Sequence, residues 1–344
     1  MQVSPYPEDL GRPIVCDMTL PQAPAGSLET PSFDSVLEER ARHGITFTSL
    51  TIASEELSVG DTVRWIAAAR RYFAARADQA VLIESTADIR AAHAAGKLAF
   101  NLHFQGTNPI AGDLGMVEVY RRLGIGHMLL AYNYRNLTGD GCHEPSDAGL
   151  SVFGRELIAE MNRVRMIVDL AHTGVRTAID AVEASTQPVI VSHSNSRAVF
   201  DHPRNIPDEL AKAVAAKGGM IGVNGVGLFL SGARKDISAE AMARHVDHFA
   251  NLLGPQHVGI GLDTVPDLKS FVDNFARKNM DRYRVGGYFK STPQFAAVDV
   301  IPKLAALLRT SGWSIADLRG LLGENWLRVI ESVWHPTAGK PSGS

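Results

Sequence analysis

The sequence is short of several features that would assign the chain to a specialised class of protein. Its 344 residues include only two cysteines, Cys16 and Cys142, too few for a disulfide framework and in no zinc-ribbon spacing. No run of Lys or Arg exceeds two residues and the net charge is −3, so neither nucleic acid nor an anionic membrane is expected as a partner. No apolar run approaches the ~20 residues that span a bilayer. The N-terminus lacks a signal-peptide pattern, so we expect a soluble, cytoplasmic protein with reduced thiols.

The sequence does contain a regular alternation of short apolar runs and stretches with helical spacing. The candidate strands are residues 14–20, 45–52, 98–105, 127–133, 166–172, 188–193, 219–226 and 257–263. Helical spacing is found at 34–43, 60–77, 86–95, 114–124, 151–163, 174–184, 207–217 and 238–253. Such alternation predicts an α/β fold with a parallel sheet. Eight strands suit a closed (β/α)8 TIM barrel, although an open doubly wound sheet gives the same pattern.

We expect one barrel domain over residues 1–344, closed by helices at 295–309 and 314–334. The segment 265–293 after the last strand is unusually long, with aromatic residues and paired glycines among charges. It is either an active-site lid or a plain surface loop. The tail 335–344 is expected to fray.

Polar residues end several of the candidate strands, where parallel barrels carry their catalytic groups. They are Asp17, Thr19, Asn101, His103, Gln105, Tyr132, His172, His193, Asn224 and Asp263. Since side chains two apart in a strand share a face, Asp17 and Thr19 are expected to point the same way. Asn101, His103 and Gln105 are expected to do the same.

His172 and His193 end two consecutive strands, 21 residues apart, so a barrel would make them neighbours at its mouth. Imidazole suits Zn²⁺ and similar ions. The alternative for each is a hydrogen-bonded structural role, and the residues alone leave the two open. Other histidines fall in helical stretches and are expected to be solvated: His43, His93, His245 and His248.

Four blocks of the sequence resemble the membrane (renal) dipeptidase family. The first two read GDGCHEPSDAGLSVFGRELIAEMNRVRMIVDLAHTG and PVIVSHSNSRAVFDHPRN. The last two read HVGIGLD and LLGENWLRVIE. They occur in the family's order and spacing, and together with the first strand the resemblance covers residues 14–334.

The resemblance implies an amidohydrolase-type barrel with two bridged zinc ions that hydrolyses dipeptides or similar small amides. In such sites the metals polarise the scissile carbonyl and activate a water. The family's two later histidine ligands match His172 and His193. Its carboxylate-gripping arginine matches Arg204, and the aspartate beside the substrate amine and the water matches Asp263.

Other positions depart from the family pattern. Asp17 occupies the position of a metal-binding histidine in the family, and Thr19 occupies that of a metal-binding aspartate. Gln105 occupies the position of the glutamate that bridges the two metals. Tyr132 stands at a substrate-contacting histidine. A neutral amide does not screen the repulsion between two dications. At most one divalent ion is therefore expected, with zinc as its expected identity and a metal-free pocket as the alternative.

The proposed ion would be held by His172 and His193, with Asp17, Gln105 and His103 as candidates to complete the site. For His103 a hydrogen-bonding role beside Gln105 is the alternative.

We therefore expect an enzyme acting on a small carboxylate-bearing substrate, most simply by hydrolysing an amide. Arg204 would bind the carboxylate and Asp263 would be the acid and base. Tyr132 would be catalytic through contact with the reacting group, and Asn224 would contact the substrate. The alternatives are lyase, isomerase or decarboxylase chemistry in the same pocket, or a ligand-binding relic without catalysis. The oligomeric state stays open, with a homodimer among the alternatives.

Overall fold

A computed structural model describes residues 4–21, 31–232, 235–266 and 294–335. Nearly all of the 265–293 excursion and all but one residue of the 335–344 tail therefore lie outside the described residues, and so does the lid interpretation.

The core of the described chain is one parallel sheet. Its strands are β1 (Cys16–Leu20), β2 (Phe47–Ser54), β3 (Ala80–Leu82), β4 (Leu98–Gln105), β5 (Ile125–Leu129), β6 (Ile167–Asp169), β7 (Ile190–Val191), β8 (Met220–Val223) and β9 (Val258–Ile260). They pair in the order β1-β2-β4-β5-β6-β7-β8-β9, and β3 pairs only with β4. Every pairing is parallel. The eight strands predicted from the apolar runs are thus confirmed.

The sheet closes on itself where β9 meets β1. The backbone N–H of Asp263 donates to the carbonyl of Thr19 at 3.1 Å. The N–H of Leu262 donates to Oδ1 of Asp17 at 2.7 Å. The pairing of β1 with β2 shifts register between Asp17 and Leu20. A nearly closed barrel results, and the open-sheet alternative is wrong.

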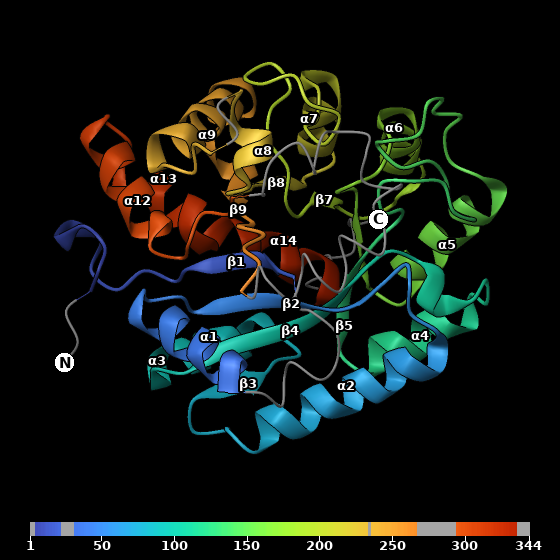
Figure 1. The fold of residues 1–344 in the computed structure, drawn as a ribbon, viewed down its shortest axis with the longest axis horizontal. Helices are drawn as coiled ribbons and strands as arrows, with labels where there is room; N and C mark the ends of the chain where they lie inside the picture. Colours follow the sequence, from blue (N-terminus) through green and yellow to red (C-terminus); the bar gives the residue numbers. More distant parts are fainter. Residues whose placement is uncertain (1–3, 22–30, 233–234, 267–293, 336–344) are drawn as a thin grey trace, which may run out of the picture.

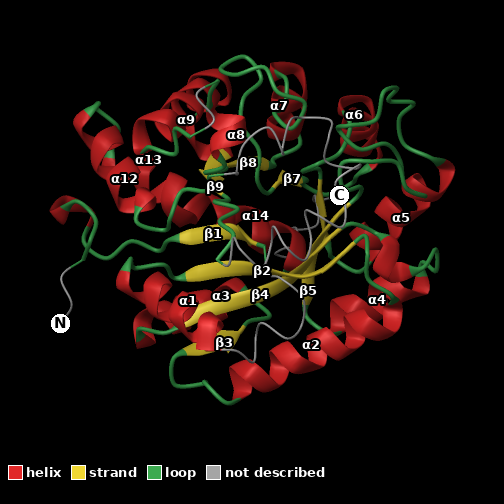
Figure 2. Cartoon of the chain, viewed as in Figure 1, coloured by secondary structure: helices red, strands yellow, loops and turns green. Residues whose placement is uncertain are grey.

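Helices cover the outside of the strands (Figures 1 and 2). They are α1 (Pro31–Arg42), α2 (Val59–Ala74), α3 (Thr86–Ala95), α4 (Gly115–Arg122), α5 (Val152–Arg163), α6 (Val175–Ala184), α7 (Asp208–Ala216), α8 (Gly227–Leu230), α9 (Ala239–Leu253), α12 (Val300–Thr310), α13 (Ile315–Arg319) and α14 (Asn325–Trp334). A π-turn over Gly320–Glu324 joins α13 to α14. None of the described helices has the length and apolar character needed to cross a bilayer.

The amino-terminal end of the barrel is filled by apolar side chains. Residues from the starts of several strands, such as Cys16, Phe47 and Ile190, pack with Trp326 and Trp334 of α14. The indole of Trp326 donates to the carbonyl of Ile260 at 3.0 Å, so the helix is fixed to the last strand. This end is a packed floor, and the polar groups are left to the opposite rim, where barrel enzymes place their chemistry.

Candidate functional site

His172 and His193 meet at the rim, as the sequence predicts for neighbouring strand ends. Their Nε2 atoms are 3.1 Å apart. Bonds of about 2.0–2.1 Å from zinc to imidazole place two ligand nitrogens roughly 3.0–3.4 Å apart, so this separation suits two ligands of one ion. The other ring nitrogen of each is held by oxygen: Nδ1 of His172 by Asn133 Oδ1 at 2.7 Å, and Nδ1 of His193 by Thr19 Oγ1 at 3.0 Å and Ser192 Oγ at 2.7 Å.

Burial and the nearby Arg204 charge hold the pKa values of both His172 and His193 well below the usual range. The rings are therefore neutral, as metal ligands must be. An oxygen on each Nδ1 also fixes which way the ring faces. The pair fits a single divalent ion in charge, spacing and orientation.

No third ligand of the usual kind completes this pair in the described part of the chain. Among those residues, no three His, Cys, Asp or Glu side chains gather closely enough to enclose an ion. Thr19, at the family's aspartate position, instead hydrogen-bonds His193. The described residues therefore supply two imidazole ligands toward one ion, and they do not offer the ligands of a second.

Asp17 is bound to other groups. Its Oδ2 pairs with Arg40 of α1 at 2.9 Å, and both side chains are fully buried. Its Oδ1 accepts the backbone N–H groups of Leu262 and Thr19. Both oxygens of Asp17 are thus engaged, one by Arg40 and one at the β1–β9 seam, where β1 meets the end of β9. Thr19 Oγ1 contacts His193 instead.

Gln105 and His103 also lie together but have neighbours of their own. Nε2 of Gln105 donates to Thr51 Oγ1 at 3.0 Å, and Nε2 of His103 contacts the same oxygen at 2.9 Å. Nδ1 of His103 contacts Ser49 Oγ at 2.9 Å. Both ring nitrogens of His103 are therefore used, which agrees with the hydrogen-bonding alternative for this residue.

Tyr132 stacks on His172, with ring centroids 4.0 Å apart. It lines a rim cavity of about 530 Å³ that also contacts Glu55, Tyr134 and Arg135. Burial raises the pKa of Glu55, and its Oε2 is buried without a hydrogen-bond partner among the described residues. The cavity thus places Tyr132, which stacks on His172, beside a carboxyl group that no sequence motif identifies.

Arg204 is buried beside the pair. One of its guanidinium nitrogens donates to the carbonyl of His193 at 3.0 Å, and the guanidinium lies 5.4 Å from the ring centre of Phe229. Its Nε is buried without a hydrogen-bond partner in the part of the chain that the structure describes, where it also has no carboxylate ion pair. A buried, unneutralised guanidinium is suited to an anionic ligand group.

Asp263 follows β9 at the same rim. Burial raises its pKa to about 7, with the Arg204 charge opposing and the Asp17 charge adding to the effect. A carboxyl group with a pKa near neutrality can take up and return a proton under ordinary conditions. Its backbone has φ +59°, and φ is also positive at His172 (+63°) and Asn133 (+62°). Such conformations cost about 1–3 kcal/mol and cluster at functional sites.

Asn224, after β8, is fully buried. Its Oδ1 accepts from Asn195 Nδ2 at 2.9 Å and from the N–H of Val226 at 3.1 Å. Its Nδ2 has no partner among the described residues. Asn224 can therefore offer one donor, while its oxygen holds the loop.

Besides Glu55, sequence reasoning missed two side chains that shape this rim. Asn133 holds Nδ1 of His172, yet the preceding run only indicated a strand end. His245 of α9 was expected to be solvated, but it is fully buried and contacts the N–H of Ser196 and the carbonyl of Leu230. Helical spacing locates a histidine on a helix without revealing which loop covers it.

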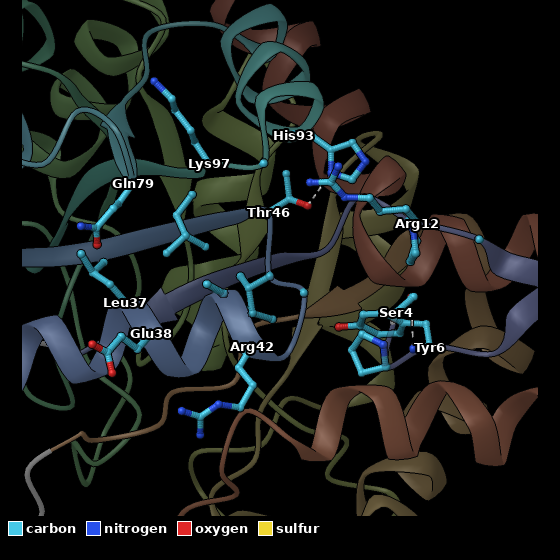
Figure 3. A pocket seen from close by; sticks show the side chains of 18 of the residues that line it. Ser4, Tyr6, Arg12, Leu37, Glu38, Arg42, Thr46, Gln79, His93 and Lys97 are labelled. Atoms are coloured by element: carbon cyan, nitrogen blue, oxygen red, sulfur yellow. Dashed lines mark hydrogen bonds between the residues drawn. The ribbon is translucent and has the colours of Figure 1, made fainter. Parts of the chain in front are cut away.

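A larger cavity of about 950 Å³ lies at the opposite end of the strands (Figure 3). Thr46, directly before β2, and Leu98, the first residue of β4, line it. Arg12, His93 and Lys97 also border it, but Nζ of Lys97 is bound to the carbonyl of Ala77. In barrels this face contributes stability, so its size does not make it the reaction site.

Comparison with known proteins agrees with this geometry. The profile of the family described as "Membrane dipeptidase (Peptidase family M19)" matches residues 39–275. An uncharacterized dipeptidase of Schizosaccharomyces pombe is 31% identical over 237 residues, which are 67% of this chain and 52% of that protein. The chain spans about half to three-fifths of the length of the first curated relatives it matches.

Two solved structures share the barrel. An amidohydrolase from Pseudomonas aeruginosa superposes with a TM-score of 0.84 at 31% identity, covering 96% of this chain and 99% of that one. A metallopeptidase from Rhodobacter sphaeroides, bound to a phosphinate mimic of the dipeptide L-Ala-D-Ala, gives 0.75 at 22% identity, covering 94% and 100%. With the profile spanning most of the barrel and the histidine pair at its rim, the chain belongs to the membrane dipeptidase family.

Proposed function

We propose that this protein hydrolyses the amide bond of a dipeptide or a similar small carboxylate-bearing substrate with one divalent ion, zinc by expectation. The observation that carries the proposal is the His172–His193 pair, whose neutral rings converge at 3.1 Å beside the buried Arg204. The family relationship favours hydrolysis over lyase, isomerase or decarboxylase chemistry and over a relic without catalysis.

Each residue has a defined task in this proposal. Arg204 binds the substrate carboxylate, which offsets its own unneutralised charge. Asn224 donates from Nδ2 to the substrate, and Tyr132 limits the space beside His172. Asp263 takes a proton from the attacking water and returns it to the leaving amine. An ion on His172 and His193 would polarise the scissile carbonyl and acidify water.

We expect no more than one tightly bound zinc per chain after dialysis. His172→Ala and His193→Ala should each abolish stoichiometric binding because each removes one of the two imidazoles whose Nε2 atoms converge at the rim. His248→Ala, which removes a partly exposed histidine paired with Asp208, should retain it. Metal analysis by mass spectrometry measures all four proteins. Two retained equivalents in the wild type would contradict the single-ion site.

Arg204→Lys should weaken substrate binding about tenfold or more while the protein stays folded, because lysine keeps the charge but loses the two-pronged guanidinium. Arg197→Lys is the matched control: Arg197 lies in the same loop, with its Nε on the carbonyl of Asn205. Steady-state KM and competition by a phosphinate dipeptide mimic give the comparison. Equal KM values for wild type and Arg204→Lys would show that Arg204 does not bind the substrate carboxylate.

A further inference from the structure

A continuous chain of hydrogen bonds runs through the barrel interior from β6 to the end of β4. Nδ1 of His127 lies 3.0 Å from Asp169 Oδ2, and its Nε2 lies 2.8 Å from Ser49 Oγ. His103 continues the chain, with Nδ1 on Ser49 and Nε2 on Thr51. Gln105 ends it by donating to Thr51 Oγ1. All members are buried, and the two imidazoles stack with centroids 4.3 Å apart.

The chain begins at a group that can only accept. Burial by itself would raise the pKa of Asp169, but hydrogen bonds from His127 and Ser192 and the nearby histidines lower it overall. Its Oδ1 already accepts the backbone N–H groups of Ala171 and Ser192. Nδ1 of His127 must therefore carry the proton that faces Asp169.

Each later link follows from the first because a neutral imidazole has one donor and one acceptor. Ser49 Oγ has Nε2 of His127 at 2.8 Å and Nδ1 of His103 at 2.9 Å. When Nδ1 of His127 holds the single ring proton, Ser49 donates to His127 and accepts from His103. His103 then has Nδ1 as its donor and Nε2 as its acceptor, which agrees with the bond that Gln105 Nε2 donates to Thr51 Oγ1. Its Nε2 then accepts the hydroxyl proton of Thr51.

We propose that this chain, anchored by Asp169, fixes the side-chain amide of Gln105 so that it offers its carbonyl oxygen, and not its NH2 group, to the reaction site. Thr51 has used its only proton on His103 and can only accept from Gln105, so Nε2 of Gln105 faces Thr51. That bond leaves Oε1 on the other side of the amide, where it can accept. Gln105 is thus a positioned oxygen acceptor for an electropositive group.

The role of this oxygen rests on the proposed function, but its orientation does not. At the rim, Oε1 of Gln105 would bind either the ion on His172 and His193 or the ammonium group of the substrate. The position that carries a bridging glutamate in the family is here a neutral amide. An amide has a donor side and an acceptor side, and the hydrogen-bond chain determines which of them faces the reaction site.

The tautomers of the two rings test the orientation directly in the wild-type protein. In the metal-free wild type, both His103 and His127 should be protonated on Nδ1, although free histidine in water prefers Nε2. Long-range ¹H–¹⁵N spectra of histidine-labelled protein, assigned with His103→Gln and His127→Gln, distinguish the two nitrogens. A proton on Nε2 of His103 would overturn the proposal and leave the proposed function untouched.

Thr51→Val tests the role of the oriented oxygen. Losing the hydroxyl should abolish the single tautomer of His103. The control Thr62→Val, which changes a buried threonine of α2 that is not part of the hydrogen-bond chain, should preserve it. If Oε1 faces the ion, Thr51→Val should weaken zinc binding about tenfold in a chelator competition. If it faces the substrate ammonium, zinc affinity should hold and KM should rise by a similar factor. If neither zinc affinity nor KM changes in Thr51→Val, the oriented oxygen of Gln105 has no role at the reaction site.

Discussion

Asp263→Asn is expected to lower turnover roughly 10²- to 10⁴-fold, the usual contribution of a general acid and base. Asparagine has nearly the same shape but cannot take up a proton. The seam should persist, because the bond from residue 263 to Thr19 uses the backbone N–H. Initial rates with dipeptides of both chiralities and with carboxylate substrates measure the effect. If the variant turns over substrate at the wild-type rate, Asp263 is not the group that transfers the proton.

The same substitution should not destabilise the metal-free protein at pH 8. Burial raises the pKa of Asp263 to about 7, so at pH 8 the folded state holds an ionised carboxylate in an unfavourable place. When the pKa of a carboxyl group is higher in the folded than in the unfolded state, the folded state binds the proton more tightly. The group therefore contributes least to the stability of the fold when the pH is above the folded-state pKa. Thermal unfolding in chelator at pH 8 should give a Tm for Asp263→Asn no lower than wild type. A large drop would mean that misfolding, and not lost proton transfer, explains reduced turnover.

Arg40→Met is expected to reduce the free energy of unfolding by about 3–5 kcal/mol. It leaves the fully buried carboxylate of Asp17 without its cation. Denaturant unfolding, monitored by the tryptophans, measures the loss.

The double variant Arg40→Met with Asp17→Asn should recover most of this stability, since asparagine is neutral and keeps an oxygen for the N–H of Leu262. Arg64→Met serves as the control, because its pair with Asp61 is exposed and should contribute less than about 1 kcal/mol. Equal losses for Arg40→Met and Arg64→Met would show that the buried charge is not the cause.

The barrel could be predicted because apolar periodicity reports on local burial. β4 occupies the predicted residues 98–105, whereas β6 ends at Asp169, three residues before the predicted end. The positive φ of His172 is incompatible with an extended strand, and no periodicity signals it. The short strand β3, only Ala80–Leu82, was missed because three residues carry no alternation.

The histidine pair was also predictable, since consecutive strands in a parallel barrel are spatial neighbours. The fate of Asp17 was not, because its partner Arg40 comes from a helix outside the sheet and nothing in the sequence links the two. The same holds for His127 and Asp169, which were read only as parts of strands. Hydrogen-bond partners between distant segments depend on how side chains pack, and local patterns do not encode them.

The β1–β9 seam has a consequence for synthesis in the cell. Asp17 and Leu262 are separated by 245 positions along the chain, so the first strand has no neighbour on one side until the last emerges from the ribosome. Contacts this distant form late, since the intervening chain must be ordered first. A nascent chain halted before residue 258 would expose one edge of β1 and the buried charge pair behind it. Such unpaired edges promote association between chains, so chaperone dependence should fall sharply once β9 is complete.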